Sequence, residues 1–291
     1  MNWMKYRIVY FLISATVIGA GIFAYLKWGL SLGIDFKGGA LIEYQVGKDF
    51  STEEAIKKIE NPSIEVHSIQ KAGENTYLIR TNPLNPSYRE NIRVVLNELT
   101  GEDAQELRFE NVGPSIGPDL IKKTIYAIAI ASSAILLWVA FQFKSFKFGV
   151  SAVLAMLHDS LVLLGSFAIL GHFFGVEIDF LFVTAMLTIL SFSVHDTIVV
   201  YDRVRETRKK VGGSTIEMAN MAISQTMVRS LNNSFTIIFM LVALILLGGT
   251  TVKWFAVALL IGTISGTYSS PFVAVPLLVV WEELQRKIKR A

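Results

Sequence analysis

The sequence contains no cysteine, and only 18% of its 291 residues are charged. Without thiols the chain forms neither disulfides nor thiolate metal sites. Soluble globular proteins carry about a quarter charged residues, and here the charges gather in segments 35–123 and 202–229 and after residue 282. The net charge of +3 is too small to indicate nucleic-acid binding. This composition is typical of a membrane protein with one polar domain.

Six long apolar runs are present, each near the roughly 20 residues that a membrane-spanning helix needs. The first run follows Lys5 and Arg7 and exceeds the roughly 7–15 residues of a signal-peptide core, so we expect an uncleaved first span. Pro271 and Pro276 are expected to kink or break the last span, where neighbouring helices can satisfy the freed carbonyls. The predicted spans are Ile8–Leu26, Thr124–Phe143, Phe148–Leu170, Ile178–Tyr201, Met227–Leu247 and Trp254–Trp281.

The placement of Lys and Arg in the short loops predicts the orientation of the spans. Basic residues gather before the first span, in the second–third and fourth–fifth loops, and in the tail, whereas the opposite short loops hold only Lys253. We therefore expect both termini to be cytoplasmic in a multi-pass protein of the cell membrane. The expected parts are residues 1–32 with the first span, an extracytoplasmic domain at 33–118, and a five-span bundle at 119–291.

The polar domain shows an alternation of strand and helix patterns. Segments 40–46 and 105–112 read as its first and last strands, and a hairpin turn at 72–75 joins two more. Ser51, followed three residues later by Glu, predicts a capping box, and Ser87 is expected to cap a second helix. The order βαββαβ is the ferredoxin-like arrangement. The fold class predicted is thus a mainly α membrane protein with a small α+β domain.

Ionisable side chains inside the spans are functional candidates, because burying them in a membrane is costly. Asp196 lies in the fourth span. Arg229, Asn232, Asn233 and Thr236 in the fifth span follow an i, i+3, i+4, i+7 spacing and share one helix face. We expect this face to point into the bundle, with Arg229 facing Asp196. A buried ion pair is weak evidence for stability, so the pair favours a functional role.

For other polar residues in the spans, function and packing both stay open. Intramembrane Asn and Thr often serve as interhelical contacts. A His-Asp pair in the third span either relays protons or sits in a hydrogen-bonded interior, and His195 is expected to be a neighbour of the carrier only. Gly262 and Gly266 predict a packing face in the last span. The residues for which both roles stay open are His158, Asp159, Asn232, Asn233 and Thr267.

The sequence gives no sign of catalytic or cofactor chemistry. Catalytic zinc usually needs three protein ligands, and only His158 and His195 of the four histidines lie deep in a predicted span. A His-Glu-x-x-His motif, a phosphate-binding glycine loop and an ATPase motif are all missing. We expect a protein that is not an enzyme and that binds no metal, cofactor or nucleic acid.

Four segments, whose order and spacing cover nearly the whole chain, form recognisable motifs. They are Gly33-Ile34-Asp35-Phe36-Lys37-Gly38-Gly39, Val112–Leu120, Asp196–Glu206 and Gly266–Ser270. The first resembles the Asp-Phe-x-Gly-Gly signature shared by SecD and SecF, and together the four resemble the SecF family of the Sec export system. The small polar domain favours SecF, because SecD resembles a version with a much larger insertion after the first helix.

The resemblance implies half of a resistance-nodulation-division (RND) type fold, with SecD as the other half. It implies that Asp196 is the titrating carboxylate, that Arg229 is its intramembrane partner, and that proton flow helps to pull the emerging polypeptide. The partners implied are SecD, the SecYEG channel, the translocating unfolded polypeptide, protons and membrane lipid. The alternative is a stand-alone RND-type exporter of lipids or hydrophobic small molecules, which predicts a second homologous half.

Overall fold

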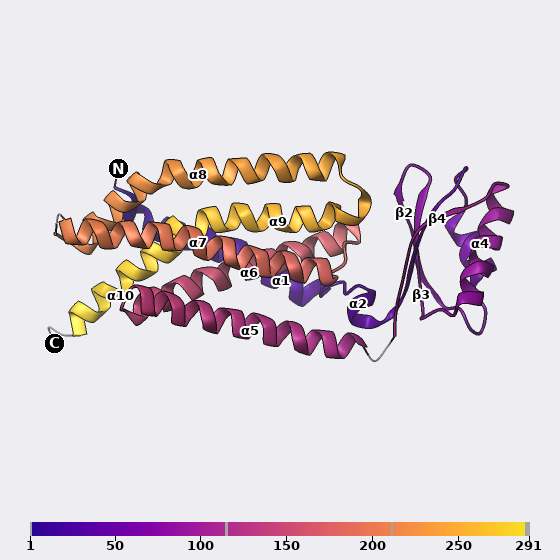
Figure 1. The fold of residues 1–291 in the computed structure, drawn as a ribbon, viewed down its shortest axis with the longest axis horizontal. Helices are drawn as coiled ribbons and strands as arrows, with labels where there is room; N and C mark the ends of the chain where they lie inside the picture. The colour runs from indigo at the N-terminus through magenta and orange to yellow at the C-terminus, as the bar shows by residue number, and fades with distance from the viewer. Residues whose placement is uncertain (1, 114–115, 211, 289–291) are drawn as a thin grey trace. The chain divides into compact units, whose positions relative to one another are not determined.

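The computed structural model describes residues 2–113, 116–210 and 212–288. Its internal contacts divide the chain into two compact units (Figure 1). The small unit is Leu32–Ile125, and the bundle joins Met1–Ser31 to Tyr126–Ala291.

The small unit is a four-stranded sheet with two helices. Its elements are α2 (Ile34–Lys37), β1 (Gly39–Gln45), α3 (Thr52–Ile59), β2 (Val66–Gly73), β3 (Thr76–Thr81), α4 (Pro86–Thr100) and β4 (Gln105–Val112). The strands lie in the order β2-β3-β1-β4, and every neighbouring pair is antiparallel. This order confirms the predicted ferredoxin-like fold. Tyr44, Ile42, Ile79, Ile92 and Leu96 form the centre of its core.

The helix ends of the small unit follow local sequence signals, with one correction. Ser51 caps α3 as expected, and its hydroxyl accepts from the Glu54 backbone N–H. The prediction that Ser87 caps the second helix is wrong, because α4 begins at Pro86 with Asn85 in the cap position. Proline suits the first helical turn, where its fixed φ is already helical and its missing N–H costs nothing.

Six helices in the described part of the chain are long and apolar enough to cross a membrane, as predicted. A short η1 (Trp3–Tyr6) precedes the first of them. The first five predicted apolar runs lie, apart from a residue or two at their ends, within α1 (Arg7–Trp28), α5 (Ile116–Gln142), α6 (Phe146–Phe174), α7 (Phe180–Lys210) and α8 (Thr215–Leu247). The sixth lies within the helical segment Thr251–Ile288. α8 begins twelve residues before the predicted Met227, because Ser214 and Glu217 form a complete capping box.

The sixth span bends without breaking. α9 (Thr250–Ser269) passes into a π-helical turn, η2 (Ser270–Ala274), which contains Pro271. α10 (Val275–Ile288) then leaves in a new direction, which is clear in Figure 1. A π-turn is a common way to absorb such a kink, so the bend that the prolines predicted is confirmed.

Close packing of small residues positions the helices of the bundle. α9 packs against α6, α7 and α8 and lies at the centre. A Cβ added to Gly262 would lie 2.1 Å from Ile189 of α7, so the Gly262–Gly266 segment is a tight packing face. α1 crosses α6 at Gly21 and Gly165, where a Cβ on Gly165 would lie 2.5 Å from the Gly21 Cα.

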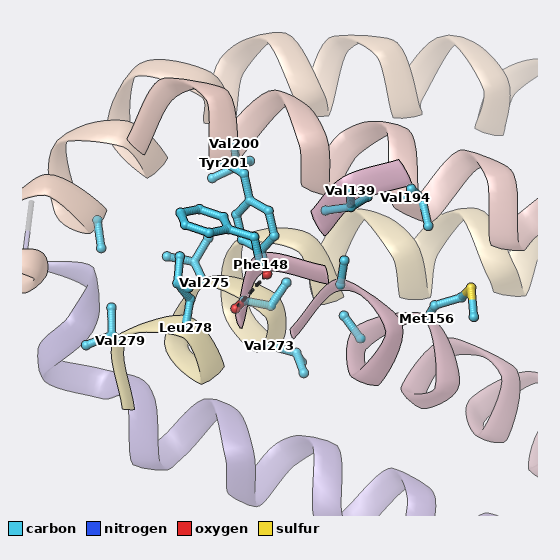
Figure 2. Close-up of a cluster of buried hydrophobic side chains, with 14 of the residues drawn as sticks. Val139, Phe148, Met156, Val194, Val200, Tyr201, Val273, Val275, Leu278 and Val279 are labelled. Carbon is cyan, nitrogen blue, oxygen red and sulfur yellow. Dashed lines mark hydrogen bonds between the residues drawn. The ribbon is translucent and has the colours of Figure 1, made fainter. Parts of the chain in front are cut away.

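The apolar core of the bundle lies among α6, α7, η2 and α10. Phe148 of α6 packs edge-on against Tyr201 of α7 at 5.0 Å between ring centroids. The Tyr201 hydroxyl donates to the Ala274 carbonyl of η2 at 3.2 Å, which Figure 2 shows as a dashed line beside Phe148, Val275 and Leu278. The π-turn is thereby tied to the C-terminal half of α7.

Candidate functional site

Among the described residues, two carboxylates inside the predicted apolar runs are buried. Asp159 of α6 is 0% exposed and Asp196 of α7 is 5% exposed. Both positions were singled out from the sequence. A charged group in such a place needs hydrogen-bonding partners or a functional reason, and the two carboxylates differ sharply in the partners that they have.

Hydroxyl groups from two other helices surround Asp159. Its Oδ2 accepts hydrogen bonds from Ser193 of α7 at 2.6 Å and Ser269 of α9 at 2.7 Å. Its Oδ1 accepts one from Ser265 of α9 at 2.5 Å and lies 3.1 Å from His158 Nδ1. An ionised carboxylate has about four lone-pair sites, so these contacts fill its acceptor capacity.

His158 extends this network to a fourth helix. Its Nε2 lies 3.0 Å from the hydroxyl of Ser14 on α1, and both side chains are buried. The network that centres on Asp159 therefore ties α1, α6, α7 and α9 together. This geometry favours the hydrogen-bonded interior over the proton relay as the role of the His158–Asp159 pair.

Asp196 has a sparser environment. Its Oδ2 accepts a hydrogen bond from Ser230 of α8 at 2.6 Å, and no other described residue donates a hydrogen bond to this carboxylate. The adjacent Thr197 is fully engaged, with the Ser193 carbonyl and the Ser270 hydroxyl both at 2.9 Å. Most lone-pair sites of Asp196 therefore remain open to a proton or to a further donor.

The expectation that the Arg229 face points into the bundle is wrong. Arg229, Asn232, Asn233 and Thr236 are all exposed, and within the described chain Arg229 makes no ion pair. The face of α8 that turns inward instead carries small hydroxyl side chains. Small residues let helices approach closely. The serine side of α8 therefore faces α7 and α9, and the larger polar side chains lie on the exposed side of the helix.

Two serines mark the inward face of α8. Ser230 reaches Asp196, and Ser234 shares a hydrogen bond of 2.6 Å with Thr267 of α9. Thr267 also donates to the Thr263 carbonyl at 2.6 Å. Thr267 thus lies at the α8–α9 contact, one helical turn from the Asp196–Ser230 bond along α8.

Polar side chains also line the exposed side of α7. We call these, together with the exposed polar residues of α8, the outer polar face. His195 and Arg229 are the chain neighbours of the bonded Asp196 and Ser230, so polar exposed groups on both helices flank the buried carboxylate. The outer polar face comprises Thr184, Thr188, Ser191 and His195 of α7 and Arg229, Asn232, Asn233 and Thr236 of α8.

Sequence reasoning missed the serines that hold the two carboxylates. Ser193, Ser265 and Ser269 contact Asp159, and Ser230 contacts Asp196. Ser265 and Ser269 are four residues apart and so share a helix face, which was the one available signal. Ser193 and Ser230 each lie on a different helix from the carboxylate that they contact, so no sequence spacing links the two.

The Asp-Phe-x-Gly-Gly segment lies in the small unit. Asp35 and Phe36 belong to the single turn of α2, and Gly38 and Gly39 follow with φ of 78° and 131°. A side chain on Gly39 would also place its Cβ 2.7 Å from the Thr81 carbonyl. Both the positive φ and the close approach require glycine, so this motif shapes the entry into β1.

The described residues include no group of three or more His, Asp or Glu side chains that could hold a metal ion. The arrangement can instead accept and release a proton at a buried carboxylate between two helices. The class that this architecture defines is a multi-pass membrane protein with one ferredoxin-like domain inserted after its first span.

Comparisons with known proteins identify the family. A model of the SecD/SecF protein export membrane protein, C-terminal part, matches residues 92–284, and a model of the SecD/SecF GG motif matches residues 29–49. Protein translocase subunit SecF of Thermobaculum terrenum is 42% identical over 96% of this chain and 93% of that protein. The chain belongs to the SecF family of protein translocase subunits.

Longer relatives contain a similar region as one part. Protein translocase subunit SecDF of Bacillus subtilis is 31% identical over 97% of this chain, which spans 38% of that protein. A crystal structure of SecDF, a translocon-associated membrane protein from Thermus thermophilus, matches with a TM-score of 0.85 and 28% identity. The match covers 97% of this chain and 39% of the SecDF chain.

Proposed function

We propose that this chain is the SecF subunit that, together with a SecD-type half, uses the proton gradient to promote protein translocation across the cytoplasmic membrane. In this proposal both termini are cytoplasmic and the small unit lies outside. The observation that carries it is the position of Asp196, a buried carboxylate with one hydrogen bond beside a polar face that is exposed in this chain. The proposal assigns no catalytic residue.

The outer polar face supports a SecD-type partner. Polar and charged side chains inside a membrane almost always face other helices or a water-filled cavity. Arg229, Asn232 and Asn233 are exposed here although they lie in a membrane-spanning helix. The SecDF relatives combine a region like this chain with further sequence in one polypeptide. A SecD-type half therefore covers this face and shields Arg229 from lipid.

In the proposed cycle a proton neutralises Asp196. Loss of the negative charge weakens the attraction of Asp196 for the Ser230 hydroxyl and for the nearby guanidinium of Arg229. The contact between α7 and α8 then favours a second arrangement, because a charge change can bias a bistable element. One proton crossing a potential of about 100 mV supplies roughly 2.3 kcal/mol.

Asp159 plays a different part in this cycle. Its four contacts from Ser193, Ser265, Ser269 and His158 hold the carboxyl group in place. We assign it to holding α1, α6, α7 and α9 as one rigid body. In the proposed cycle α8 then moves relative to this rigid body.

Replacing Asp196 by Asn tests the proposal. Membrane vesicles that contain the variant with SecD and SecYEG should translocate a precursor protein but lose the increment that the proton gradient adds. Asp202→Asn is the matched control, because Asp202 is an exposed residue six positions further along the same helix. A full proton-dependent increment in the Asp196→Asn vesicles would refute the carrier role.

The alternative, a stand-alone exporter of lipids or hydrophobic small molecules, is not favoured. The relatives named above are translocase subunits.

A further inference from the structure

A basic pocket lies where several helices of the bundle end. It has a volume of about 280 Å³ and opens between the α5–α6 turn, the end of α7, the start of α8 and α10. Neither Asp159 nor Asp196 is among its lining residues. The lining residues on which the argument depends are Phe143, Lys144, Phe148, Arg205, Arg208 and Glu282.

The one carboxylate of the pocket lining is already neutralised. Glu282 is only 6% exposed. Its Oε1 accepts a short hydrogen bond from Lys147, and its Oε2 accepts one from Thr215 at 2.5 Å. Arg208 approaches Oε1 at 3.4 Å. Two cations, Lys147 and Arg208, thus lie within ion-pair distance of this buried carboxylate.

The cations that remain point to an anionic ligand. Lys144 is exposed in the tight turn after α5. Arg205 hydrogen-bonds the Gln142 carbonyl at 3.1 Å, and within the described residues neither Lys144 nor Arg205 makes an ion pair. The Arg208 side chain remains 56% exposed despite its contact with Glu282. Lys144, Arg205 and Arg208 thus line one opening, and of these three only Arg208 lies within ion-pair distance of a carboxylate among the described residues.

The wall of the pocket is apolar and aromatic. Phe143 and Phe148 stack with ring centroids 5.1 Å apart, and Arg205 lies over the Phe143 ring at 6.0 Å. Leu278 of α10, labelled beside Phe148 in Figure 2, closes another side. A cationic rim above an apolar wall suits a molecule with an anionic head and a hydrocarbon body.

We infer that this pocket binds the phosphate of an anionic membrane phospholipid. The headgroup phosphate lies among Lys144, Arg205 and Arg208, and the first part of an acyl chain lies against Phe143 and Phe148. Guanidinium groups suit phosphate because their N–H donors form a planar fork. Basic pockets between membrane helices are known to take anionic headgroups.

The location favours a lipid over a free phosphate ion. The pocket lies where the apolar part of α5 ends and that of α6 begins, which is the level of the headgroups if these helices span the membrane. An inorganic ion would use the cations alone, whereas a phospholipid also brings a hydrocarbon body to the apolar side chains that line the pocket. This inference does not depend on the proton relay.

Lipid titration of the purified full-length chain in detergent tests the inference. The probes are dioctanoyl-phosphatidylglycerol, dioctanoyl-phosphatidylcholine and inorganic phosphate, and bound lipid is counted by native mass spectrometry. Each cation near an anionic lipid contributes about 1 kcal/mol, which is about fivefold in affinity. Lys144→Gln should therefore weaken phosphatidylglycerol binding about fivefold, and the double variant Lys144→Gln/Arg205→Gln about 25-fold.

The matched control removes the same charge elsewhere. Lys209→Gln/Lys253→Gln changes two exposed lysines outside the pocket lining and should bind like the unmodified chain. The single variant Lys144→Gln alters only an exposed side chain. It therefore still tests the pocket if the double variant does not fold. Equal binding of the two lipids, or equal losses in the pocket and control variants, would overturn the inference. Full displacement of phosphatidylglycerol by equimolar inorganic phosphate would assign the pocket to a free anion and overturn the lipid assignment.

Discussion

Replacing Asp159 by Asn should destabilise the bundle more than the same replacement at Asp196. In the Asp159 variant one carboxylate oxygen becomes an amide that donates, so two hydroxyl groups lose their acceptor. If the amide takes the Oδ2 position, these are the hydroxyls of Ser193 and Ser269. Each hydrogen bond to a charged group contributes about 1.5–3 kcal/mol.

The net cost is smaller than the sum of those two hydrogen bonds. The hydroxyls can rotate to other acceptors, and the variant no longer buries a charge, so about 2–4 kcal/mol remains. At about 2–4 °C per kcal/mol for a unit of this size, the apparent unfolding temperature in detergent should fall by roughly 10 °C. Asp196→Asn changes one hydrogen bond, from Ser230, and should lower the unfolding temperature by about half as much.

The assay is a thermal scan of the purified chain in one detergent, with Asp202→Asn as the exposed control on α7. Equal shifts for the Asp159 and Asp196 variants would show that the serine contacts do not hold Asp159 more firmly. An unchanged unfolding temperature for Asp159→Asn would refute the rigid-frame argument.

Three further outcomes are expected. Gly165→Ala should lower the apparent unfolding temperature, because its Cβ would lie 2.5 Å from the Gly21 Cα, whereas Gly19→Ala has no neighbour within 4 Å and should not. Arg229→Gln should leave the thermal stability of the isolated chain unchanged, since the side chain is exposed, but should reduce proton-driven translocation and co-purification with SecD. The hydrogen bond from Lys71, with a smaller effect of Tyr77, lowers the pKa of Asp49. The stability that Asp49 contributes is therefore present above its unfolded pKa and lost as pH falls through the lowered one, so the acid part of a thermal stability profile should flatten in Asp49→Asn.

The sequence predicted the elements better than their ends. Apolar runs located all six spans, and strand alternation located the ferredoxin-like domain. The start of α8 was missed because it depends on the capping box of Ser214 and Glu217, in a segment that is too polar to be recognised by hydropathy. Proline geometry at Pro86, rather than the Ser87 hydroxyl, decided where α4 begins.

The candidate site shows what periodicity cannot supply. Spacing showed that Arg229, Asn232 and Asn233 share a face, but it did not show in which direction that face points. The direction follows from the close approach of Ser230 and Ser234 to α7 and α9. Likewise the three serines around Asp159 come from two helices, and only the fold brings them together.

The glycine crossing of α1 and α6 makes the two membrane attachments of the small unit unequal. α1 meets α6 backbone to backbone at Gly21 and is tied to it again through Ser14 and His158. α5, on the other side of the small unit in the chain, is the least buried of the six spans. Of the two helices that precede and follow the small unit in the chain, α1 is therefore held to the rest of the bundle more extensively than α5.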